Sequence, residues 1–182
     1  MTEPSAKPAL ADRAVYRVTI EAPIRVVWDT LVKTDTVLPF FFGAVCDAKE
    51  GLAPGKPMRM VSADRKFAIV VGEVLDFSPP HRYAHTMKFT QYPDAPCTVI
   101  YELKEIEGGT EFTLITEGVP AGTKTEKSMV PGGVFITENL KALVETGKPK
   151  FAGRMIIALG PMLNFTVPKA CRIENWPPGR YQ

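Results

Sequence analysis

The fold is most clearly indicated by residues 14–28, which read AVYRVTIEAPIRVVW. Apolar and polar residues alternate along 14–21, which is the period of a half-buried strand. Pro23 suits the first turn of a helix, where its missing amide hydrogen costs nothing. Beyond it, apolar residues recur every three or four positions and give the helix one apolar face. The stretch therefore predicts a strand followed directly by a helix around Trp28.

The rest of the chain predicts an antiparallel sheet and one long helix. Five further strands are expected at 58–63, 67–77, 82–89, 98–107 and 111–119. The short connections between them, rich in Gly, Pro and Asp, require antiparallel pairing. Asp35 is expected to cap a second short helix ending near Phe42, and the polar stretch 121–127 is expected to be mobile. A long helix follows at 129–146, with Gly147 as its stop. These elements predict an α+β fold, in which a curved antiparallel sheet of six or seven strands wraps around a long C-terminal helix, with two short helices after the first strand.

The length of 182 residues suits a single domain. We expect a flexible leader at 1–13, the domain at 14–148 and an apolar extension at 149–182. That extension is too short and too interrupted to span a bilayer, which requires about 20 apolar residues. Three roles remain open for it: packing on its own domain, a homodimer contact, and a membrane-surface or cavity-covering role.

Composition argues against several classes of protein. The formal net charge is only +2 and no run of Lys or Arg occurs, so binding to nucleic acid and broad capture by an anionic membrane are not expected. Cys46, Cys97 and Cys171 lie far apart, which argues against a disulfide framework or a zinc site. The N-terminus lacks the apolar segment of a signal peptide. We therefore expect a cytoplasmic protein without a transmembrane segment.

Alternation within the strands indicates which side chains meet in the interior. Ten residues are expected to line a ligand-binding site between the sheet and the long helix: Tyr83, His85, Met87, Phe89, Tyr101, Phe112, Leu114, Ile136, Leu140 and Leu143. A dry void of typical pocket size, about 300–1,000 Å³, would cost roughly 7–24 kcal/mol. Typical stabilities are only about 5–15 kcal/mol. The interior must therefore be filled by side chains, hydrated, or occupied by a ligand.

Short motifs in order along about 14–148 resemble the START-like, or SRPBCC, superfamily. They are YRVTIEAP at 16–23, GEVL at 72–75, YEL at 101–103, FTL at 112–114 and NLKAL at 139–143. The most similar branch is the one named after the activator of heat-shock-protein-90 ATPase. The resemblance implies a helix-grip fold with an apolar cavity between the sheet and the C-terminal helix. Its members bind lipids, sterols or plant hormones, act as polyketide cyclases, or assist a chaperone.

The chain departs from that branch at two positions. Met87 and Val134 stand where the resemblance leads us to expect tryptophan. Both changes remove bulk, which could enlarge or reshape the cavity.

Three functional hypotheses follow. The favoured one is binding of an apolar or amphipathic small molecule, such as a lipid, in the cavity. The second is a co-chaperone-like module that stimulates a heat-shock-protein-90 ATPase. The third is a cyclase-like or hydrolase-like enzyme in which His85 and Tyr83 or Tyr101 act as acid and base. We assign no catalytic residue and expect neither a metal nor a cofactor, because no acidic or cysteine cluster joins His81 and His85 at metal-ligand spacing.

Overall fold

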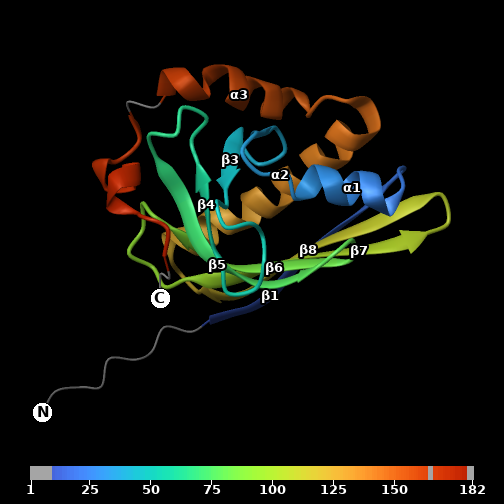
Figure 1. The fold of residues 1–182 in the computed structure, drawn as a ribbon, viewed down its shortest axis with the longest axis horizontal. Coiled ribbons are helices and arrows are strands. Elements are labelled where there is room, and N and C mark those ends of the chain that lie inside the picture. The colour runs from blue at the N-terminus through green and yellow to red at the C-terminus, as the bar shows by residue number, and fades with distance from the viewer. Residues whose placement is uncertain (1–9, 164–165, 180–182) are drawn as a thin grey trace, which may run out of the picture.

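The computed structural model describes residues 10–163 and 166–179, which form one curved sheet and three helices (Figure 1). The strands are β1 (Leu10–Ile20), β2 (Val37–Leu38), β3 (Ala44–Asp47), β4 (Pro57–Val61), β5 (Ala68–Ser78), β6 (Arg82–Phe89), β7 (Cys97–Ile106) and β8 (Gly109–Pro120). The helices are α1 (Ile24–Leu31), α2 (Lys124–Thr146) and α3 (Phe151–Leu163), followed by the 3-10 turns η2 (Lys169–Cys171) and η3 (Ile173–Asn175). The strand order is β1-β8-β7-β6-β5-β4-β3-β2, and all neighbours pair antiparallel.

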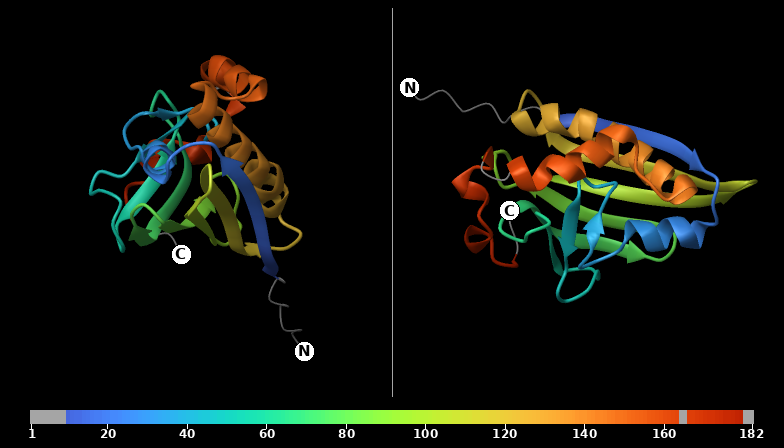
Figure 2. Two further views of the ribbon diagram at one scale, coloured as in Figure 1. Left: turned by 90° about the vertical axis from the view of Figure 1, so that its right-hand side faces the viewer. Right: turned by 90° about the horizontal axis from the view of Figure 1, so that it is seen from above.

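The long helix α2 lies against the inner face of the sheet, over β1 and β8 (Figure 2). Gly133 permits this close approach, because a Cβ atom at that position would lie 2.4 Å from the Tyr16 ring. The interior formed in this way includes Phe112 and Leu140, which have no exposed surface. Val70 and Val74 of β5 also belong to it. The expected α+β fold, with a curved antiparallel sheet and a long helix after it, is confirmed.

Two details of the prediction were wrong, and both concern residues after α1. The sheet has eight strands, because the short strands β2 and β3 extend it beyond β4. The second short helix expected from Asp35 to Phe42 does not form. Residues 37–38 form the strand β2, and residues 39–43 form the turn that leads into β3. The buried side chains of Leu38 and Phe40 are instead held by the β2–β3 hairpin.

Two element starts also differ from the expectation. The first strand begins at Leu10, and the first nine residues of the predicted leader lie outside the described residues. Helix α2 begins at Lys124, within the stretch expected to be mobile. Thr123 caps it by accepting a hydrogen bond from the Glu126 amide, and the Glu126 carboxylate accepts one from the Gly122 amide.

The extension contacts the rest of the chain both before and after α3. Before α3, the Lys150 amide donates to the Asn139 side-chain oxygen over 2.9 Å. After α3, Ile173 and Trp176 pack against a small buried cluster of Val45, Val61, Ala68 and Val71. The proposed boundary between domain and extension stays a prediction. Among the described residues, no helix combines the length and apolar character needed to cross a bilayer.

Candidate ligand-binding site

A large apolar cavity lies between the sheet, α2, α3 and the β2–β3 turn. Its volume is about 800 Å³, within the range of small-molecule sites. The sheet contributes Val70, Met87, Phe89, Val99, Tyr101 and Leu114 to its wall. Helix α2 contributes Met129, Phe135 and Ile136, and α3 contributes Ile156, Ile157 and Gly160. The cavity therefore lies where the sheet grips the long helix.

The size of this cavity determines what can fill it. At about 24 cal/mol per Å³, an empty dry cavity of about 800 Å³ would cost about 19 kcal/mol. That exceeds the stability of an ordinary domain, about 5–15 kcal/mol. Water or a ligand must therefore occupy the space. Water gains few hydrogen bonds against an apolar wall, so an apolar ligand that displaces it is favoured.

Two buried hydroxyl groups are among the polar points of the apolar wall. Tyr101 on β7 and Thr116 on β8 both line the cavity and are almost completely buried. Thr116 is paired with Val99 in the β7–β8 register, and Tyr101 lies two residues further along β7, so both side chains lie on the same face. Neither hydroxyl bonds to another group among the described residues. A carbonyl or hydroxyl group of a ligand would satisfy them.

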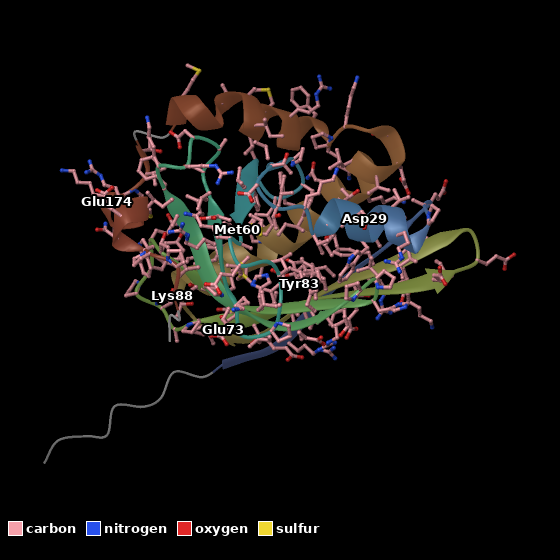
Figure 3. All side chains as sticks on the ribbon, viewed as in Figure 1. Asp29, Met60, Glu73, Tyr83, Lys88 and Glu174 are labelled. Atoms are coloured by element: carbon pink, nitrogen blue, oxygen red, sulfur yellow. The ribbon has the colours of Figure 1, made fainter. Side chains whose placement is uncertain are left out.

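A second, much smaller cavity lies behind Tyr101. Its volume is about 20 Å³, which is room for one water molecule. Tyr83, His85 and Tyr101 line it and stack together, with ring centroids 5.2 Å apart for Tyr83 and His85 and 5.6 Å apart for the two tyrosines. The Tyr83 hydroxyl is buried without a hydrogen-bond partner among the described residues. Figure 3 shows Tyr83 in the interior above the sheet, with Met60 nearby.

This aromatic cluster is uncharged at neutral pH. Burial lowers the pKa of His85 to about 4, although its hydrogen bond to the Thr86 carbonyl partly opposes the shift. The neutral ring donates from Nδ1 to that carbonyl over 2.8 Å, which leaves Nε2 as an acceptor. Burial also raises the pKa of Tyr83 and of Tyr101. The aromatic cluster therefore offers neutral hydrogen-bonding groups and no charge to pair with an ionic ligand.

The buried imidazole predicts an acid-sensitive contribution to stability. In the unfolded chain His85 takes up a proton near its ordinary pKa of 6.5, whereas in the folded protein it does so only near 4. Its contribution to the free energy of unfolding is thus present above about pH 6.5 and is lost towards pH 4, about 3 kcal/mol in total. Urea unfolding of the wild type and of His85→Gln across this range measures it. Parallel pH profiles for the two proteins would contradict the prediction.

The structure distributes the ten predicted site residues over three environments. Five line the large cavity: Met87, Phe89, Tyr101, Leu114 and Ile136. Tyr83 and His85 line only the small cavity behind it. Phe112 and Leu140 are fully buried in the core, and Leu143 is half-buried against it. Their roles in binding a ligand stay predictions.

Sequence reasoning missed two parts of the wall. The first is the β2–β3 turn, where Phe42 stacks on Phe135 with ring centroids 4.1 Å apart. The run of three phenylalanines at 40–42 is a sequence signal for this contact, although the sequence pattern predicts a helix there. The second part is α3, which belongs to the extension for which a cavity-covering role was one of three alternatives. Which of its residues face the cavity depends on tertiary packing and has no local signature. Among the described residues, no three His, Cys, Asp or Glu side chains gather in a way that could hold a metal ion.

The curved sheet, the long helix gripped by it and the cavity between them define a helix-grip domain of the SRPBCC type. The family model described as "Activator of Hsp90 ATPase homolog 1-like protein" matches residues 21–145, and the chain belongs to this family. No curated protein matches the chain.

Solved structures with the same fold include three informative neighbours. DynU16, a protein in the dynemicin biosynthetic locus, is 23% identical with a TM-score of 0.61, and the match covers 76% of this chain and 49% of that one. CalU16 from Micromonospora echinospora is 19% identical with a TM-score of 0.55, over 80% and 81% of the two chains. PFC0360w, an HSP90 activator from Plasmodium falciparum, is 18% identical with a TM-score of 0.58, over 76% and 99%. The chain thus spans about half the length of DynU16. The fold is compatible with a ligand-binding domain in general.

Proposed function

We propose that the protein binds an apolar or amphipathic, uncharged small molecule in the large cavity. The observation that carries this proposal is a cavity of about 800 Å³ whose wall is apolar apart from a few polar points. Such a site buries the ligand's hydrocarbon surface, and a few polar groups orient it. The three buried free cysteines fit a reducing compartment such as the cytoplasm.

The chemistry of the wall narrows the ligand class. Phe89, Tyr101 and Phe135 present aromatic surface, which suits a ring system or a lipid chain. The hydroxyls of Tyr101 and Thr116 suit one carbonyl or hydroxyl group at the inner end. Among the described residues of the wall, the one charged side chain is Asp64, which pairs with Lys66 over 3.8 Å. A neutral ligand with one polar end therefore fits best.

The proposal predicts that filling the cavity weakens binding. Met87 lines the cavity and is 5% exposed, so Met87→Trp places a larger ring in the ligand's space. We expect the dissociation constant for the neutral fluorescent probe N-phenyl-1-naphthylamine to rise at least about tenfold, because lost apolar contacts cost about 1.4 kcal/mol per tenfold change. A fluorescence titration with direct excitation of the probe measures this dissociation constant. Native mass spectrometry of protein purified from its own host tests separately for a resident ligand.

Val134→Trp is the matched control. It adds the same side chain to α2 at a position that is 45% exposed and does not belong to the cavity wall. The probe should bind this variant as it binds the wild type. No probe binding to the wild type, or equal weakening in both variants, would contradict the proposed function.

A second candidate is a module that stimulates a heat-shock-protein-90 ATPase. It is favoured by the family description and by the fold shared with the Plasmodium falciparum HSP90 activator. This role predicts that the chain binds the heat-shock protein and raises its ATPase rate. If purified protein does neither, this candidate fails, whatever the outcome of the probe titration.

A further inference from the structure

Helix α3 is apolar on two opposite sides. At 3.6 residues per turn, Ile156, Ile157 and Gly160 fall on one side, and these residues line the large cavity. Phe151, Met155, Leu159 and Met162 fall on the other side. We call these four residues the outer stripe. An ordinary surface helix is apolar on one face and polar on the other, so the outer stripe is an additional feature that cavity packing does not explain.

The outer stripe is exposed. Phe151 and Met162 have exposed fractions of 74% and 70%, and Met155 and Leu159 are exposed to 42% and 40%. Figures 1 and 2 show α3 at the outer surface of the molecule, on the far side of α2 from the sheet. A contiguous exposed apolar surface of this kind marks an interaction site.

Charge in this part of the chain is strongly biased. Residues 147–182 contain six of the 22 basic residues and one of the 20 acidic residues, so this segment carries a net charge of +5 while residues 1–146 carry −3. The overall charge of +2 conceals this difference. Lys148 and Arg154 are exposed beside the stripe, and no carboxylate among the described residues forms an ion pair with either. The partner of this surface should therefore be negatively charged.

We propose that the outer stripe of α3 docks on the surface of an anionic phospholipid bilayer. The apolar side chains would enter the boundary between headgroups and acyl chains, and Lys148 and Arg154 would lie among the phosphates. The large cavity lies directly beneath the same helix, which contributes Ile156, Ile157 and Gly160 to its wall. Docking would place this wall next to the membrane, from which an apolar ligand can enter or leave without crossing water. Only this ligand exchange rests on the proposed function.

The charges disfavour a second copy of the chain as the partner. In a twofold dimer built on the outer stripe, the same surface of each subunit would form the interface. Lys148 and Arg154 of one copy would then face the same residues of the other, and juxtaposed like charges oppose association. A bilayer rich in phosphatidylglycerol has no such conflict.

Vesicle co-sedimentation tests the proposal with the full chain. We expect the wild type to bind vesicles of phosphatidylcholine with about 30% phosphatidylglycerol, and to bind phosphatidylcholine alone more weakly. The variant Phe151→Gln, Met162→Gln changes the two most exposed stripe residues, neither of which belongs to the cavity wall. Its binding to the mixed vesicles should fall at least about tenfold. Binding of N-phenyl-1-naphthylamine in solution should be unchanged.

The matched control is Val15→Gln, Val26→Gln, which changes two residues that are each 47% exposed on β1 and α1. This variant should bind vesicles as the wild type does. Lack of wild-type binding, equal binding to both lipid mixtures, or undiminished binding of the stripe variant would overturn the proposal. So would a dimer in sedimentation velocity that the stripe variant dissociates. Failure of the proposed function has a different signature, namely vesicle binding without any probe binding.

Discussion

Replacing Arg59 by methionine is expected to lower the free energy of unfolding by about 3–5 kcal/mol. Arg59 on β4 donates two hydrogen bonds to the Asp47 carboxylate on β3, and both side chains are almost completely buried. The second Asp47 oxygen is buried without a hydrogen-bond partner among the described residues. Removing the guanidinium would leave a buried carboxylate with no compensating charge, which is the costly way to break such a pair.

Urea unfolding measures this loss, and Arg82→Met is the matched control. Arg82 also pairs with carboxylates, those of Asp76 and Glu102, but its side chain is 38% exposed. An exposed pair contributes only about 0–1 kcal/mol, so this variant should be nearly as stable as the wild type. The double variant Asp47→Leu, Arg59→Met should recover part of the lost stability, since it removes both buried charges. Equal losses in Arg59→Met and Arg82→Met would refute the argument.

Arg59 also holds the segment 169–176 against the sheet. Its third hydrogen bond, from Nη1, reaches the Trp176 carbonyl over 2.6 Å. Next to it, the Ile173 amide donates to the Lys66 carbonyl over 2.9 Å. We therefore expect Arg59→Met to release the segment 169–176 first, and limited trypsin digestion should cut after Lys169 or Arg172 sooner than in the wild type.

The fold could be predicted because its signals are local. Alternation in 82–89 and 111–119 shows directly which side chains face the interior, and short connections leave only antiparallel pairing. The start of α2 is also encoded, in the capping box of Thr123 and Glu126. The polar composition of 121–127 hides this signal, because it is also typical of a mobile segment. The β2–β3 hairpin was beyond this reasoning, since two-residue and four-residue strands show no measurable period.

The candidate site was predictable only in part, for a different reason. Inward-facing strand residues such as Met87 and Tyr101 follow from alternation, and the structure places them in the cavity wall. Alternation cannot distinguish them from Phe112, which is equally inward-facing but packed in the core. Whether such a residue faces the cavity or another side chain depends on where α3 and the β2–β3 turn pack in the folded protein. Those placements are long-range contacts, which a local pattern does not encode.

Replacing Gly72 by alanine is expected to lower the free energy of unfolding by about 3 kcal/mol or more, or to prevent soluble expression. Gly72 lies in β5, where a Cβ atom would come within 1.9 Å of the Thr86 carbonyl oxygen and 2.9 Å of its carbon. Both are backbone atoms of the neighbouring strand β6, so no side chain can rotate away to make room. The overlap can be relieved only by moving β6 or β5.

That movement would reach the site, because the same Thr86 carbonyl accepts the His85 hydrogen bond and Met87 follows it in the cavity wall. Gly72→Ala should therefore also weaken probe binding in any soluble protein. For stability, Gly132→Ala is the matched control, since a Cβ atom there meets nothing within 4 Å and the residue lies inside α2. In a helix interior, alanine should raise the free energy of unfolding by about 0.5–1 kcal/mol. Similar unfolding midpoints for the two variants would contradict this prediction. They would show that β5 and β6 are not in close contact at Gly72 and Thr86, and that this contact does not position His85 and Met87.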